Sequence, residues 1–148
     1  MAKAEFKVVG TSPTRMGGVE RVVGKGVYGT DLMHKDQLHG AILRSQYAHA
    51  KIVSIDTSEA KKVSGVHAVV TAEDAPNVRY GRSYIDRHIL ARGKVRFMGD
   101  PVAAVPAESL AIAKQALKKI KVVYEPLPVV IDPEAATKAD APVLHEDM

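Results

Sequence analysis

The fold is decided by the stretch Gly99-Asp100-Pro101-Val102-Ala103-Ala104-Val105. A turn leads here into an uncharged apolar run, which is typical of a buried central strand. A helix is predicted next, over Ser109 to Ile120, with apolar side chains on one face and lysines on another. The apolar face is expected to hold Leu110, Ala113, Leu117 and Ile120. A second strand, Val122 to Tyr124, follows the helix, so the pattern predicts a strand-helix-strand packing unit with no catalytic motif.

A second unit of the same kind is predicted over Lys51 to Val70. Its helix, Thr57 to Val63, begins at a hydroxyl residue and ends before Gly65, a residue type that tolerates the left-handed C-terminal position. The strands of this unit are expected over residues 51–56 and 66–70. Further strands are expected over residues 38–43, 94–98 and 129–131, a long loop over 77–93, and a helical turn over 133–136. This order predicts an α/β fold of mixed α/β and α+β character, with a mixed sheet and two main strand-helix-strand units.

The length of 148 residues and the hydrophobic content of 46% favour one domain, residues 1–148. Residues 10–18 carry turn formers without apolar periodicity, so residues 1–18 are expected to be an extended N-terminal arm. Residues 132–148 resemble a linker, and we expect it to lead toward a further domain outside this chain.

Charge and composition exclude several classes of protein. The net charge of +4 is a weak indication of polyanion binding. The chain has no Cys, which excludes disulfides, Fe–S ligation, thiolate metal sites and a cysteine nucleophile within it. Charges near the N-terminus argue against a signal peptide, and no apolar run is long enough for a membrane span. We therefore expect a cytoplasmic protein with no membrane partner.

A glycine-rich segment, Gly24-Lys25-Gly26-Val27-Tyr28-Gly29, matches the dinucleotide-binding fingerprint. The fingerprint requires a following helix with an apolar face, and residues 30–36 show none. We expect these glycines to lie at a strand bend or bulge instead.

Other candidate sites are weak. The six histidines show no metal-binding pair, and residues 145–147 are expected to form an exposed polar tail. The basic stretch Arg79 to Arg96 contains two tyrosines, as in single-strand nucleic-acid binders, but an aspartate interrupts it, so a solvated loop or a docking surface for an acidic partner is favoured. Nothing in these patterns assigns a catalytic, cofactor-binding or metal-binding residue.

Five blocks of sequence carry a more specific signal. They are residues 24–31, 43–52, 64–74, 95–103 and 124–128. In this order and spacing they resemble the N-terminal α/β-hammerhead domain of the aldehyde oxidase and xanthine dehydrogenase large subunits, from about Thr14 to Glu146.

The resemblance implies part of an oxidoreductase, a molybdenum hydroxylase that acts on aldehydes, purines, other heteroaromatics, carbon monoxide or a CoA ester. Molybdopterin, Fe–S clusters and FAD would belong to other domains or subunits, which are the expected partners. The hammerhead domain would pack against the molybdopterin-binding domain and help wall the substrate approach. No catalytic residue is carried over to this chain, which we expect to be inactive alone.

Polar residues at strand ends are the candidates for that interface or substrate channel. They are Arg44, Tyr47 and His49, together with the turn Gly99, Asp100 and Pro101. Two alternatives stay open: a basic module that binds nucleic acid through residues 79–96, and a split-gene subunit of a molybdenum hydroxylase.

Overall fold

The computed structural model describes residues 7–146 and 148. The chain divides into two compact units, Met1–Lys35 and Asp36–Met148. The described part of the first unit contains a short helix, α1 (Gly18–Val22), and a single 3-10 turn, η1 (Gly29–Asp31). Residues 7–17 form neither helix nor strand.

The prediction that the glycine-rich segment lies at a strand bend is wrong. Gly24 terminates α1 instead: its φ is +70°, its N–H donates to Arg21 O, and the next N–H, of Lys25, donates to Glu20 O at 2.8 Å. These bonds are those of the Schellman motif, in which a left-handed glycine satisfies the last carbonyls of a helix. A helix of five residues is too short to show a periodic pattern, so only the structure reveals the cap.

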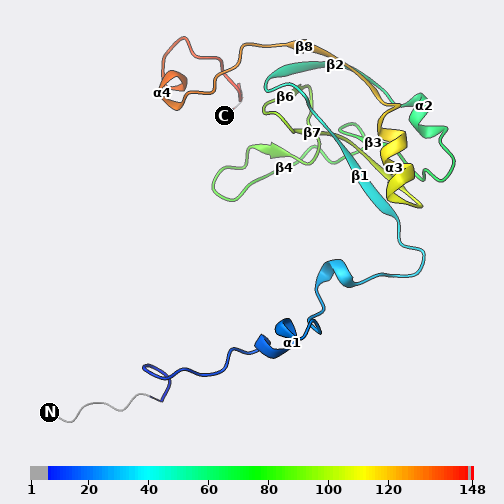
Figure 1. Ribbon diagram of the computed structural model, residues 1–148. Helices are drawn as coiled ribbons and strands as arrows, with labels where there is room; N and C mark the ends of the chain where they lie inside the picture. Colours follow the sequence, from blue (N-terminus) through cyan, green and yellow to red (C-terminus); the bar gives the residue numbers. More distant parts are fainter. Residues whose placement is uncertain (1–6, 147) are drawn as a thin grey trace. The chain divides into compact units, whose positions relative to one another are not determined.

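Two three-stranded sheets form the frame of the second unit (Figure 1). In the first, β7 (Pro101–Ala107) lies between β1 (His39–Arg44) and β3 (Val70–Thr71). In the second, β2 (Ala50–Asp56) lies between β6 (Lys94–Val95) and β8 (Lys121–Pro126). A separate hairpin pairs β4 (Arg79–Tyr80) with β5 (Arg87–His88) inside the segment expected to be a loop.

The α/β class is confirmed, and so are both strand-helix-strand units. One strand-helix-strand unit runs from β2 through α2 (Ser58–Lys61) to β3. The other runs from β7 through α3 (Leu110–Leu117) to β8. Each strand-helix-strand unit therefore crosses from one sheet to the other. The described strands pair antiparallel throughout, where a mixed sheet was expected.

One part of the core lies between α3 and the first sheet, and another joins the second sheet to β7 around Ala50, Val95 and Val102. Ala103 and Val105 of β7 pack with Ala116 of α3, and all three are fully buried. Small side chains allow the helix to approach the strand closely, while β1 and β3 protect the edges of β7. Leu110, which was expected on this face, is 44% exposed because it occupies the first turn, at the margin of the buried stripe.

Three predicted strands differ from the structure. Residues 94–98 contribute only Lys94–Val95, because the chain turns at Phe97. Residues 66–70 pair only at Val70 and through an isolated bridge at Val66. Residues 129–131 form no strand: Pro126 and Pro128 lack the N–H groups that would continue β8.

The predicted helical turn is present as α4 (Pro133–Ala136), capped by the carboxylate of Asp132. Across the residues that the structure describes, no helix has both the length and the apolar character needed to span a membrane.

Candidate functional site: a strand-end junction beside an open groove

The structure brings four of the predicted site residues together where β1 ends: Arg44, Gly99, Asp100 and Pro101, the last of which pairs with Arg44. The turn between β6 and β7 is tied to this end by two backbone bonds, from Ser45 N to Asp100 O and from Gly99 N to Ser45 O, both 2.9 Å. Arg44 Nη1 donates to Gly99 O, also at 2.9 Å. Gly99 has a φ of +90°, a conformation that favours glycine, so the turn depends on this residue type.

Asp100 is the buried acid of this turn, with 8% of its surface exposed. Its carboxylate accepts a hydrogen bond from Arg96 N–H at 2.9 Å. Burial raises the pKa of Asp100 above its ordinary value, and the bond from Arg96 N–H opposes that shift. Pro101 begins β7, and its carbonyl accepts from Ala91 N–H at 2.6 Å.

Tyr47 and His49 lie on the side of the junction that faces β8. The Tyr47 ring is 5.0 Å from the ring of Tyr124, centroid to centroid. His49 is 5% exposed, and its Nδ1 lies 2.7 Å from Pro128 O. A carbonyl oxygen only accepts, so Nδ1 must carry the proton and Nε2 of the neutral ring is an acceptor. Within the described residues Nε2 is buried and has no hydrogen-bond partner.

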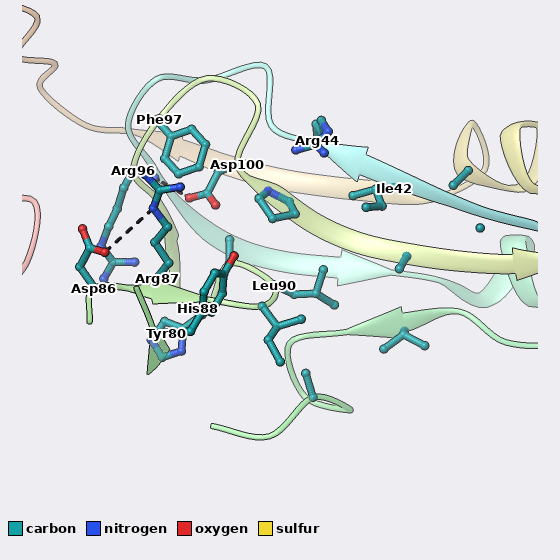
Figure 2. Close-up of a pocket in the computed structure, with 18 of the residues that line it drawn as sticks. Ile42, Arg44, Tyr80, Asp86, Arg87, His88, Leu90, Arg96, Phe97 and Asp100 are labelled. Carbon is teal, nitrogen blue, oxygen red and sulfur yellow. Dashed lines mark hydrogen bonds and ion pairs between the residues drawn. The ribbon is translucent and has the colours of Figure 1, made fainter. Parts of the chain in front are cut away.

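A groove of about 940 Å³ opens on the other side of the junction (Figure 2). Its floor is the face of β1 and β7 that points away from α3, where Gly40, Ile42, Ala104 and Pro106 follow the two-residue period of the strands. The segment that contains β4 and β5 forms one wall. Of the six predicted site residues, Arg44, Asp100 and Pro101 line this groove, whereas Gly99, Tyr47 and His49 do not.

The C-terminal segment closes one end of the groove with Leu144 and His145. Lys94, whose side chain is 10% exposed, holds this segment: its Nζ lies 2.6 Å from Glu146 Oε1 and donates to Val143 O at 3.3 Å. Arg96 Nε donates to Leu144 O at 2.9 Å.

The expectation that residues 145–147 form an exposed polar tail is therefore wrong for His145, which is half-buried, whereas the Glu146 side chain is 65% exposed although it pairs with Lys94. The hydrogen bond from Lys94 lowers the pKa of Glu146. Burial, followed by the nearby charge of Arg96, lowers the pKa of His145. Asp147 lies outside the described residues.

Several cationic side chains of the basic stretch 79–96 bind groups of this same chain. Arg92 Nη2 donates to the carbonyls of Ala72 and Ala75, the latter at 3.1 Å. Lys94 and Arg96 hold the C-terminal segment. A side chain that is committed to internal carbonyls is a poor phosphate ligand, so this arrangement weakens the nucleic-acid alternative.

Sequence reasoning missed the hairpin wall and the C-terminal closure. Strands of two residues carry no readable alternation, and the partners Lys94 and Glu146 are 52 residues apart. Both β1 and β7 were predicted as strands, but no local pattern indicated that one of their faces would form the floor of a groove. Among the described residues, no group of three His, Asp or Glu side chains could hold a metal ion, so no metal chemistry is assigned to them.

Comparison with known proteins gives one consistent result. Residues 23–128 match the family model described as "Aldehyde oxidase and xanthine dehydrogenase, a/b hammerhead domain". A probable xanthine dehydrogenase subunit of Bacillus subtilis is 44% identical over 92% of this chain, which covers 18% of that protein. The nicotinate dehydrogenase large molybdopterin subunit of Eubacterium barkeri is 33% identical over 97% of this chain, which covers 34% of that protein.

Among solved structures, reconstituted CO dehydrogenase from Oligotropha carboxidovorans matches with a TM-score of 0.84 and 40% identity, over 94% of this chain and 18% of that one. The chain thus spans about a fifth of the first relatives that it matches. The match covers both strand-helix-strand units and the strand-end junction. The chain belongs to the aldehyde oxidase and xanthine dehydrogenase family, and it contains the family's α/β-hammerhead domain.

Proposed function

We propose that this chain is a non-catalytic domain of a molybdenum-dependent hydroxylase or dehydrogenase. It packs against a molybdopterin-binding domain and helps to wall the substrate approach, with residues 132–148 leading toward that domain. The observation that carries the proposal is the match of residues 23–128 to the hammerhead domain. The Eubacterium barkeri relative is a large molybdopterin subunit, which supports the choice of partner.

The chemistry would belong to the partner. A molybdopterin centre supplies oxidation or reduction of the substrate, with Fe–S and flavin groups in further domains or subunits. The described residues offer neither a thiolate nor a group of three convergent metal ligands, and no step is placed on them. Arg44, Tyr47, His49, Gly99, Asp100 and Pro101 are proposed to contribute contacts at or beside the domain interface. A cytoplasmic location is part of the same proposal.

A second candidate is a large subunit that is split between two polypeptides. This chain covers 34% of the Eubacterium barkeri relative and 18% of the Bacillus subtilis relative, so the former is a much shorter polypeptide. Members of the family therefore differ in how much of the large subunit one polypeptide contains. The chain would then assemble with a separate molybdopterin-binding polypeptide.

Affinity purification from native cells tests both forms of the proposal. A tag on this chain should retain a molybdopterin-binding polypeptide in equal amount, or reveal one longer polypeptide, together with molybdenum measured by mass spectrometry. Recovery of the chain alone, from cells grown with molybdate, would contradict the proposal. Molybdenum-dependent oxidation of an aldehyde or purine by the purified chain itself would contradict its non-catalytic role.

The nucleic-acid alternative makes a separate prediction. Binding to a polynucleotide would weaken steeply with salt, because several phosphate contacts release counterions. We expect no such salt-dependent binding near physiological ionic strength.

A further inference from the structure

We propose that the groove between the β1–β7 floor and the hairpin wall receives an acidic, apolar-rich segment of the molybdopterin-binding domain. The inference rests on the proposed function. It names the face of the molecule that contacts the partner and the chemical character of the partner segment. The segment would place apolar side chains on the floor and a carboxylate beside Arg44.

The floor of the groove is apolar and rigid, and several of its side chains are small. Gly40 and Ala104 expose little more than backbone, and Ile42 is 47% exposed. β7 is hydrogen-bonded on both sides, and α3 packs on its opposite face, so the floor has little freedom to collapse onto itself. A rigid apolar surface of this kind binds a partner without a large ordering cost.

The walls add further apolar surface. Ile89 is 49% exposed and Phe97 is 44% exposed, and both line the groove. The cavity of about 940 Å³ extends along two strands and is near the upper end of the range for small-molecule sites, of about 1,000 Å³. A polypeptide segment makes better use of such a shape than a small ligand does.

The charges at the rim favour an anionic partner. Asp86 has an ion-pair partner within the chain, because its Oδ1 lies 4.0 Å from Arg87 Nε. Asp100 is buried and its carboxylate already accepts the hydrogen bond of Arg96 N–H, so it is committed within the chain. Arg44 donates to a neutral carbonyl, and none of the ion pairs among the described residues includes it. Its guanidinium at the mouth of the groove is therefore suited to bind a carboxylate in the bidentate manner.

Two buried ring nitrogens give independent support. Nδ1 of His88 and Nδ1 of His145 lie in residues that line the groove, and neither has a hydrogen-bond partner in the described part of the chain. His88 Nε2 accepts from Arg79 Nε at 3.4 Å, so in the neutral ring Nδ1 is a donor. Native proteins pair nearly all such atoms, and a carbonyl or carboxylate of the docked segment would accept a hydrogen bond from His88 Nδ1.

The length of the relatives indicates which polypeptide could occupy the groove. The matched proteins continue far beyond the part that corresponds to this chain, which covers 18% of the first of them. The groove is thus a surface that a larger assembly can cover, and a molybdopterin-binding domain is the partner that the proposed function already names.

The test uses the chain and a fluorescein-labelled peptide of alternating leucine and glutamate, followed by fluorescence anisotropy. Two control peptides separate the contribution of charge from that of apolar contact. One alternates leucine and lysine, and the other alternates serine and glutamate. We expect the leucine-glutamate peptide to bind at least about tenfold more tightly than either of the others, because only it satisfies both the floor and Arg44. Equal binding of the lysine peptide would overturn the charge assignment.

Groove variants and matched controls locate the binding. Arg44→Glu and Ile42→Asp should each weaken binding by about tenfold, with Ile42→Ala as the milder variant if Ile42→Asp unfolds in a thermal melt. Lys114→Glu makes the same charge change on the exposed side of α3, and Val123→Asp makes the same apolar-to-acidic change on β8, outside the groove. Both controls should keep the affinity within about twofold. If the controls weaken binding as much as the groove variants, the peptide binds elsewhere and the inference fails.

Assembly with the molybdopterin-binding polypeptide of the same cells separates this inference from the proposed function. A wild-type complex that tolerates Arg44→Glu and Ile42→Asp would overturn the groove assignment and leave the proposed function intact. If no complex forms with the wild type, the proposed function fails, while the peptide titration still decides the chemistry of the groove. Self-association of the chain that Ile42→Asp abolishes would identify a second copy as the occupant, and would also overturn the inference.

Discussion

Asp100 shows how one residue can stabilise a turn and still cost free energy. Its carboxylate satisfies the N–H of Arg96, a bond that organises the approach to β7. The same carboxylate is 8% exposed, and burial raises its pKa above the ordinary value of 3.8. The native state thus binds the proton more tightly than the unfolded chain does, so the free energy of unfolding contributed by this group falls as pH rises from about 3.8 through the folded pKa.

Two substitutions at Asp100 separate the hydrogen bond from the charge. Asp100→Asn keeps an acceptor for Arg96 N–H and removes the buried charge, so we expect the melting temperature at pH 7 to rise by about 1–3 °C. Asp100→Ala removes the acceptor as well and should cost about 1 kcal/mol. Thermal melts from pH 3 to pH 8 should show that the fall in stability with rising pH is reduced in both variants. Equal destabilisation by Asn and Ala at pH 7 would show instead that the negative charge stabilises the turn.

Gly65 is a second residue whose type is dictated by local geometry. Its φ is +81°, and a Cβ at this position would lie 2.9 Å from Ile112 Cδ1 of α3. We expect Gly65→Ala to lower the free energy of unfolding by about 1–2 kcal/mol in urea titrations, because an L-residue is strained in the left-handed region. Gly40→Ala is the matched control: an added Cβ has nothing within 4 Å, and the stability should change by less than about 0.5 kcal/mol. Equal effects of the two substitutions would contradict this account.

At the scale of elements, α3 shows how sequence and packing cooperate. Ser109 was expected at the start of the helix, and in the structure its Oγ accepts from Ile112 N–H at 3.3 Å. The helix is only eight residues long, so its termini account for much of its backbone hydrogen bonding. Its position is decided by Ala113 and Ala116, which are fully buried.

The cap of α3 is therefore expected to matter for the whole domain. Ser109→Ala should reduce the free energy of unfolding by about 1 kcal/mol, because one N–H of the first turn loses its partner. Ser109→Asp retains an acceptor, and its negative charge interacts favourably with the positive end of the helix dipole. This variant should therefore keep most of the wild-type stability. Chemical denaturation followed by circular dichroism measures both, and failure of Asp to rescue would show that the hydroxyl has another role.

At the scale of the whole molecule, the apolar core belongs to one of the two units. All buried hydrophobic residues of the described chain lie beyond position 40, within Asp36–Met148. Neither α1 nor η1 of the first unit contains a buried residue. The two units should therefore differ sharply in their resistance to unfolding.

Removal of residues 1–35 tests this division. The remaining unit keeps both sheets and α3, so we expect its melting temperature to stay within about 2 °C of the full chain. Limited proteolysis of the full chain should cut first within residues 7–35 and leave the second unit intact. A large loss of stability on truncation would show that the first unit contributes to the core of the second.

The sequence by itself determined the strands β1, β2, β7 and β8, the helix α3, the two strand-helix-strand units and the family resemblance. Local patterns suffice for these elements, because the alternation of apolar residues, a hydroxyl cap and turn glycines act within a few neighbouring residues. The polar strand ends Arg44 and Asp100 could be singled out for the same reason.

Only the tertiary structure decided which strands pair, where the groove opens and what closes it. β2 pairs with β8 across a long stretch of chain, and Lys94 holds Glu146 from 52 residues away. The Schellman role of Gly24 and the two-residue strands of the hairpin wall were equally hidden. These features depend on contacts between distant segments or on elements too short to have a period, and no local pattern of residues encodes either.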